Sequence, residues 1–169
     1  HLEYRQATGG AHLEIKWSTQ PPTPTPTRTP TPTRTPTPTP SSGPASFRLS
    51  PSSGSYSLGE QFDVHVVLNS GEHELCSYIV LLHYDAARLQ AISVTPVLYP
   101  FEHSAIEDDG ILFSALPGSP LFGGFQGEET VARIRFSVIA GGSAHVTFDF
   151  TPGSVYETSA LACDSDATD

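Results

Sequence analysis

The sequence predicts an all-β fold, an antiparallel β-sandwich of jelly-roll type with about eight to nine strands. Three observations predict it. From Phe47 onward the chain is a succession of short apolar or alternating segments separated by Gly, Pro, Asn and Ser. No segment combines a helical period with capping residues, although Asp85–Leu89 is compatible with a single helical turn. The stretch is about 120 residues long, a normal size for one domain.

The individual strands follow from the period of their apolar residues. In Gln61–Leu68 the side chains of Phe62, Val64, Val66 and Leu68 fall on one face, whereas Cys76–Tyr84 is apolar on both faces. The other segments alternate over shorter lengths or end at turn residues. The expected strands are Phe47–Leu49, Gln61–Leu68, Cys76–Tyr84, Leu89–Val94, Gly110–Ala115, Thr130–Val138 and Ala144–Phe150.

Composition divides the chain into four parts. Residues 21–40 consist of nine Pro, nine Thr and two Arg, and they lie within a linker that we place at 20–46. Alternating Pro fixes φ and removes amide donors, so this tract favours extended polyproline II, with about 60 Å of semi-rigid reach. The sandwich is expected at 47–162, and a polar tail at 163–169 looks truncated.

Residues 1–19 are too few to form a core alone. Leu13, Ile15 and Trp17 alternate with Glu14 and Lys16, which is typical of a half-buried strand. Together with the Gly9-Gly10-Ala11 turn, this segment resembles the closing strands of a PA14 domain. The resemblance implies that these strands complete a truncated upstream domain, whose sugar- and calcium-binding loops would lie further upstream.

Charge limits the possible partners. Residues 47–169 contain four basic and sixteen acidic residues, a net charge of −12. A basic footprint for nucleic acid is absent, and attraction to an anionic lipid surface is unfavourable. No run of 18 apolar residues predicts a membrane span. The acidity suits a cationic or neutral partner, such as an uncharged polysaccharide, but it is also a common way to maintain solubility.

The two cysteines leave two states open. Cys76 and Cys163 could form a disulfide in an oxidising compartment, or both could stay free, because sequence alone does not bring two Cα atoms within reach. Many Thr beside Pro suggest an O-glycosylated stalk, which belongs outside the cell. We therefore expect an extracellular or cell-surface protein.

The order of motifs within the sandwich is informative. A Gly-acidic turn opens the strand in Leu58–Val64, the segment Tyr78–Val94 contains Tyr84-Asp85 followed by Leu89, and Val131–Val138 is a third strand before a Gly-Gly turn. This ordered set resembles a cohesin domain over about residues 47–157. The resemblance implies a non-catalytic binding module that docks a dockerin-type protein partner, in a polysaccharide-degrading or cell-surface assembly.

The candidate docking surface follows from the strand Cys76–Tyr84. If Tyr78, Val80, Leu82 and Tyr84 point inward, then Ser77, Ile79, Leu81 and His83 point outward. An outer face with two large aliphatic residues is either a binding patch or is covered by the module's own chain, for example by 96–104. In cohesins this face contacts the dockerin, and Leu116 lies near the later contact strand. Ser77, Ile79, Leu116 and Pro117 depart from the polar residues usual in the family, which puts a standard dockerin interface in doubt.

Two other binding modes remain open. A carbohydrate-binding module would stack sugars on loop aromatics, for which the candidates are Tyr99, Phe101, Phe122 and Phe125, although such residues often anchor loops in a core. A passive spacer domain on a stalk would bind nothing.

Metal and catalytic chemistry have weaker support. Glu107, Asp108 and Asp109 could supply oxygen ligands to calcium, but Asp-Gly also suits a hairpin turn that enters Gly110–Ala115. No Cys-x-x-Cys, His-x-x-x-His, nucleophile elbow or phosphate loop is present. We therefore expect no enzyme activity and no cofactor.

Overall fold

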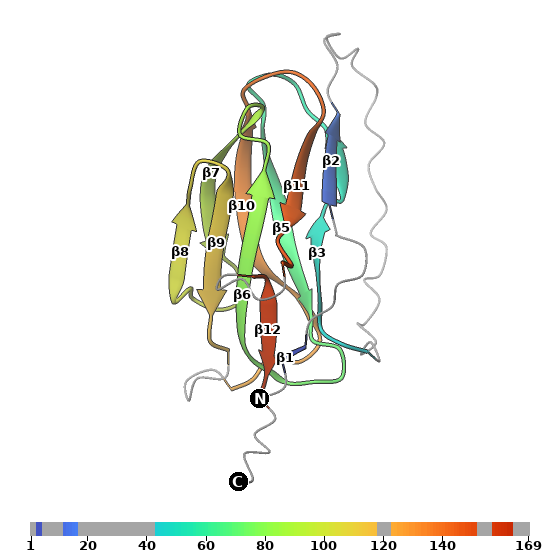
Figure 1. Ribbon diagram of the computed structural model, residues 1–169, viewed down its shortest axis with the longest axis vertical. Helices are drawn as coiled ribbons and strands as arrows, with labels where there is room; N and C mark the ends of the chain where they lie inside the picture. The colour runs from blue at the N-terminus through green and yellow to red at the C-terminus, as the bar shows by residue number, and fades with distance from the viewer. Residues whose placement is uncertain (1–2, 5–11, 17–42, 118–122, 152–156, 164–169) are drawn as a thin grey trace, which may run out of the picture.

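The computed structural model describes residues 3–4, 12–16, 43–117, 123–151 and 157–163. Two β-sheets pack face to face in this part of the chain, and no helix is present in it (Figure 1). The all-β sandwich predicted from the sequence is confirmed. The described part of the chain also contains no helix long and apolar enough to cross a membrane.

The smaller sheet is antiparallel throughout and has the order β3-β5-β10-β7. Its two central strands are long, and a register shift interrupts the pairing of β10 with each of its neighbours. The strands are β3 (Ser46–Ser50), β5 (Gln61–Asn69), β10 (Glu128–Val138) and β7 (Leu89–Pro96).

The larger sheet is organised around β6 (Leu75–Tyr84). One edge of β6 pairs with β9 (Gly110–Ala115), which in turn pairs with β8 (His103–Ile106). Two strands share the other edge. The first half of β6 pairs with β12 (Ser159–Ala162), and the second half pairs with β11 (Ala144–Phe148).

Two strands from before the Pro/Thr tract extend this larger sheet. β1 (Glu3–Tyr4) pairs with β12, and β2 (His12–Lys16) lies between β11 and β4 (Ser53–Ser55) (Figure 1). These two strands, predicted to complete a truncated upstream domain, thus pair within this chain, with the edges of β11, β12 and β4, which are not visible in the sequence. Their origin in an upstream PA14-like domain stays a prediction.

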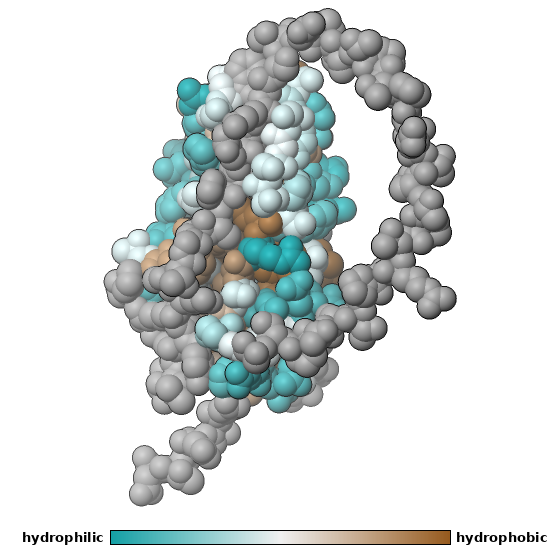
Figure 2. All heavy atoms as spheres, turned by 90° about the vertical axis from the view of Figure 1, so that its right-hand side faces the viewer, coloured by the Kyte–Doolittle hydropathy of each residue, from teal (hydrophilic) through white to brown (hydrophobic). Residues whose placement is uncertain are grey.

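Apolar side chains from both sheets fill the space between them. Val64, Val80, Phe113 and Phe136 are fully buried, and Phe62 stacks on Phe136. The four residues predicted to point inward from Gln61–Leu68 are all buried. Figure 2, a view onto the side that carries β2 and β3, shows apolar residues in the middle of this side, with hydrophilic ones above and below.

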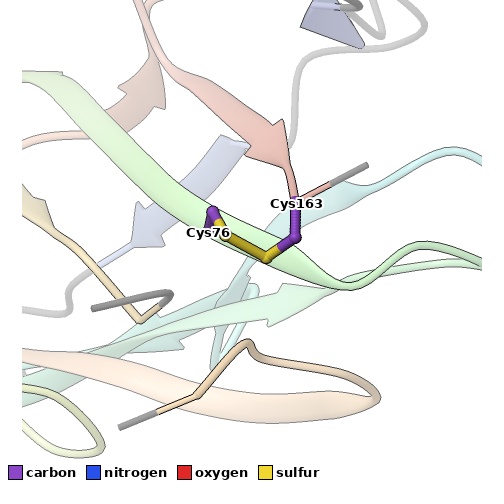
Figure 3. The surroundings of a disulfide bond; sticks show 2 residues. All are labelled: Cys76 and Cys163. Carbon is purple, nitrogen blue, oxygen red and sulfur yellow. A yellow bond between two sulfur atoms is a disulfide. The ribbon is translucent and has the colours of Figure 1, made fainter. Parts of the chain in front are cut away.

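A disulfide joins Cys76 of β6 to Cys163, which directly follows β12 (Figure 3). The two Cα atoms are 4.8 Å apart, although the residues are separated by 87 positions in the sequence. The amide of Cys163 also donates to the carbonyl of Glu74. The bond therefore fixes the last described strand to the central strand of the larger sheet.

All seven strands predicted from Phe47 onward are present, Gly110–Ala115 with the same bounds and the others with ends moved by at most two residues. The turn at Asp85–Leu89 is also present, since the amides of Arg88 and Leu89 donate to the carbonyl of Asp85. The Asp85 carboxylate accepts from the amide of Ala87, as its position after the strand predicts. The strands β4, β8 and β12 were not predicted, because they are short and their sequences carry little alternation.

Candidate functional site

The two faces of β6 differ as the sequence predicts. Tyr78, Val80, Leu82 and Tyr84 are buried between the sheets. Ile79 and Leu81 are half-buried, and His83 is exposed. The outer face of β6 is therefore neither sealed nor fully open to solvent.

The aliphatic residues of β6 continue into a short apolar row across the sheet. Leu81 pairs with Leu112 of β9, and Leu112 pairs with Ala105 of β8. Paired residues of an antiparallel sheet lie on the same face. We call Ile79, Leu81, Leu112 and Ala105 the outer apolar row; all four are half-buried.

Small polar residues lie beside this row. Ile79 pairs with Ser114 of β9 on one side and with Ser159 of β12 on the other. His103 of β8 pairs in turn with Ser114, and it is exposed. Ile79 therefore lies between two small hydroxyl side chains, one on each neighbouring strand.

The segment 96–104, named above as a possible cover, lies elsewhere. The ring of Phe101 stacks on Phe113, which points into the sandwich, with 4.8 Å between ring centroids. The amide of Glu102 donates to the carbonyl of Ser114, and β8 follows at the outer edge of β9. Because β9 separates this segment from β6, it does not cover Ile79 or Leu81.

A polar pair marks one end of the face. Nε2 of His83 lies 3.2 Å from a carboxylate oxygen of Asp149, which follows β11. Hydrogen bonds from Thr151, together with the contact to His83, hold the pKa of Asp149 below its ordinary value, against the opposing effect of burial. Asp149 therefore stays an ionised acceptor for His83 to a lower pH than an ordinary aspartate would.

The backbone of Leu81 is fixed where the two partner strands of β6 meet. The amide of Leu81 donates to the hydroxyl of Thr158 over 3.0 Å, and that hydroxyl donates to the carbonyl of Leu81 over 2.9 Å. The same carbonyl accepts from the amide of Asp149. Neither β11 nor β12 has a residue paired with Leu81. The hydrogen bonds from Thr158 and Asp149 take the place of that pairing, and they fix the strand that carries the outer apolar row.

The two remaining predicted docking residues lie toward the other end of the face. Ser77 pairs with Leu161 of β12 and is half-buried. Leu116 directly follows β9 and is 47% exposed. The structure thus places Ser77, Ile79, Leu81 and His83 on β6 in sequence, with Leu116 beyond the end of the neighbouring strand.

Sequence reasoning missed Leu112 and Asp149. The alternation of Gly110–Ala115 does separate Leu112 and Ser114 from Ile111 and Phe113. The sequence holds no signal that β9 is the neighbour of β6, or that Leu112 lies opposite Leu81, because register is decided by the pairing itself.

Three of the four aromatic residues proposed for sugar stacking are described by the structure, and they pack against or within the core. Phe125 is buried, with 3% of its surface exposed, and Tyr99 and Phe101 pack against the core. Phe122 lies outside the described residues. Phe125 therefore has no free ring face for a sugar, and the expectation that it binds carbohydrate was wrong, because its ring is part of the buried core while its backbone bridges to Leu75 of β6.

The acidic turn is the hairpin turn between β8 and β9. The amide of Glu107 donates to the carbonyl of Gly110, and the carbonyl of Asp109 accepts from the amide of Tyr84. Glu107, Asp108 and Asp109 are all exposed. Within the described ranges, no three His, Cys, Asp or Glu residues are arranged to hold a metal ion.

No protein-family profile and no curated protein matches the sequence. Solved structures do match. A type II cohesin–X-dockerin complex from Acetivibrio cellulolyticus matches with a TM-score of 0.50 and 14% identity, covering 68% of this chain and 84% of that chain. A cohesin module from a family 33 glycoside hydrolase of Clostridium perfringens matches with a TM-score of 0.47 and 13% identity, covering 72% of this chain and 91% of that chain. A type I cohesin–dockerin complex from Clostridium thermocellum matches with a TM-score of 0.47 and 16% identity, covering 62% of this chain and 79% of that chain. The sandwich described here thus has a cohesin-like fold.

Proposed function

We propose that this chain carries a non-catalytic docking module, and that the outer face of β6, β9 and β8 binds a protein partner of dockerin type. The observation that carries the proposal is the register that places Leu81 opposite Leu112, next to Ile79, on the outside of the larger sheet. The similarity to cohesins in complex with dockerins supports the class of partner.

The outer face of β6, β9 and β8 has the composition that is typical of the centre of a small protein–protein interface. A half-buried aliphatic row surrounded by Ser114, Ser159 and the His83–Asp149 pair gives an apolar middle with a polar rim. Burying the remaining exposed part of Ile79, Leu81 and Leu112 supplies the driving force, and the polar groups at the rim set the orientation. Because residues 47–169 have a net charge of −12, a partner with a neutral or basic surface would associate fastest.

The test is to place a charge in the middle of the row. We expect Leu81→Asp and Leu112→Asp each to weaken binding of a calcium-loaded dockerin at least about tenfold, since a buried unpaired charge costs more than the lost contact. The matched control is Ile92→Asp on β7, an aliphatic residue that is 43% exposed on the other sheet. Affinity is measured by calorimetry against a type I dockerin and a type II X-dockerin, and folding by near-ultraviolet circular dichroism.

Four results would count against the proposal. Binding that all three variants retain would place the interface elsewhere, and an equal loss in Ile92→Asp would show that the effect is not specific to this face. If the unchanged protein binds neither dockerin, the docking function fails and a spacer role is favoured. Retention of the unchanged protein on insoluble glucan would favour the carbohydrate-binding alternative, which has less support because Phe125 is buried.

The setting of the module is part of the proposal. The Cys76–Cys163 disulfide and the Pro/Thr tract both suit an extracellular or cell-surface protein. Such a module would attach its partner to an assembly that degrades or holds polysaccharide. Thiol labelling of the protein recovered from its native compartment, with and without reductant, tests this setting, and two free thiols would contradict it.

A further inference from the structure

The strand β2 occupies a slot with a strand edge on either side. It pairs antiparallel with β11, through Ile15 opposite Ala144 and Leu13 opposite Val146. It pairs parallel with β4, through Glu14 opposite Ser53 and Lys16 opposite Ser55. Figure 1 shows β2 beside these strands at one side of the sandwich. Without β2, the edges of β11 and β4 would both lack a partner in the described part of the chain.

The sequence of the segment matches this slot. Val146 and Ala144 are buried, and His145 between them is exposed. The residues paired with them alternate in the same way, as Leu13, Glu14 and Ile15. An extended segment with this alternation, and with backbone partners on both edges, is what strand addition to a sheet edge requires.

The sequence that connects β2 to β3 has a composition that disfavours a sharp return of the chain. β2 ends at Lys16 and β3 begins at Ser46, and residues 21–40 between them alternate Pro with Thr. A tract of this composition favours an extended form of about 60 Å. β2 nevertheless lies beside β4, which is separated from the end of β3 by two residues, since Lys16 pairs with Ser55. A stiff tether that must fold back lowers the effective concentration of the chain's own strand at the slot.

We propose that the slot between β11 and β4 is a strand-acceptor site for the His12–Lys16 segment of a second copy of this chain. Exchange between copies forms the same backbone pairs and leaves the Pro/Thr tract extended. The site lies at the sandwich edge that β11 and β4 form, away from β8 and β9, so this self-association is separate from docking on the outer apolar row.

The experiment uses the full chain with one new cysteine in each of two variants, Glu14→Cys and His145→Cys. These positions face each other in the register of β2 and β11. Both natural cysteines are already joined, so each variant carries a single free thiol. After mixing and mild oxidation, we expect a disulfide-linked dimer that contains one copy of each variant, in a yield that rises with protein concentration. A single chain that carries both substitutions reports pairing within one copy.

A proline substitution separates strand exchange from other contacts. We expect light scattering to detect a dimer of the unchanged chain. Glu14→Pro, as a single substitution in that chain, removes an amide donor from the middle of β2 and should abolish this dimer. Glu14→Ala is the matched control and should keep it. A cross-link in the doubly substituted chain alone, with none in the mixture, would overturn the proposal. So would the absence of a cross-link in both samples, which would instead agree with a place for this segment in an upstream domain.

Discussion

Tyr78 and Tyr84 lie on the same strand with both rings inside the sandwich, but only one of their hydroxyl groups has a hydrogen-bond partner. The hydroxyl of Tyr84 donates to the carbonyl of Glu107 over 3.1 Å. The hydroxyl of Tyr78 is buried, and no residue in the described ranges pairs with it. Burial, and then the nearby Tyr99, raises the pKa of Tyr78, so this hydroxyl stays protonated.

This difference predicts opposite effects for the same substitution. Tyr78→Phe removes a buried hydroxyl without a partner and should raise the free energy of unfolding by about 1 kcal/mol, whereas Tyr84→Phe removes a hydrogen bond and should lower it by about 1 kcal/mol. Urea denaturation at neutral pH measures both. A clear loss of stability in Tyr78→Phe would mean that its hydroxyl does have a partner.

The disulfide should make a large contribution to stability. It closes a loop of 87 positions, for which the chain-entropy model gives about 4 to 5 kcal/mol. The double variant Cys76→Ala, Cys163→Ala should lose most of this amount in urea denaturation. The unchanged protein in reductant should behave in the same way, while reductant should leave the double variant unaffected. An unchanged denaturation midpoint in the double variant would contradict the expectation.

Two glycines with positive φ should tolerate alanine very differently. Gly71 has φ +64, and a Cβ there would lie 1.8 Å from the carbonyl oxygen of Gly43. That carbonyl accepts a hydrogen bond from the amide of Glu72, so it is not free to move. Gly59 has φ +79 with open space around it. We expect Gly59→Ala to cost about 1 to 2 kcal/mol from backbone conformation alone.

Gly71→Ala should cost clearly more than Gly59→Ala, because the clash with Gly43 adds to the same backbone strain. Thermal unfolding of the two variants under one set of conditions gives the comparison. Equal melting temperatures would show that the loop around Gly43 yields easily.

Acid should weaken the smaller sheet through two ion pairs. Hydrogen bonds from Arg135 hold the pKa of Asp63 below its ordinary value, and a hydrogen bond from Arg48, with a further one from Asn69, lowers the pKa of Glu128. A depressed carboxyl pKa contributes stability that is present above the unfolded value, about 3.9 for Asp and 4.3 for Glu, and is lost as pH falls through the folded value.

The urea midpoint should therefore decline as pH falls below about 4.5, and Asp63→Asn should make that decline shallower. Glu129→Gln, at an exposed position next to Glu128, is the matched control and should leave the slope closer to that of the unchanged protein. Identical pH profiles for the unchanged protein and Asp63→Asn would show that the Arg135 pair contributes nothing measurable.

The sequence by itself determined the class of fold and the inward-facing residues of the long strands β5 and β6. Val64 and Val80 are buried, and His83 is exposed, as a period of two requires. That pattern is local, because alternate side chains of any strand point to opposite faces. The turn at Asp85 could be read in the same way, from a carboxylate placed directly after a strand.

Only the tertiary structure decided which strands are neighbours, and this choice creates the candidate sites. Leu112 lies opposite Leu81, Asp149 reaches His83, and Cys163 reaches Cys76 across segments that are distant in the sequence. The place of β2 between β11 and β4 was likewise invisible, because an alternating segment fits any sheet edge with a complementary face. Strand pairing depends on packing and loop closure over the whole chain, and no local period encodes it.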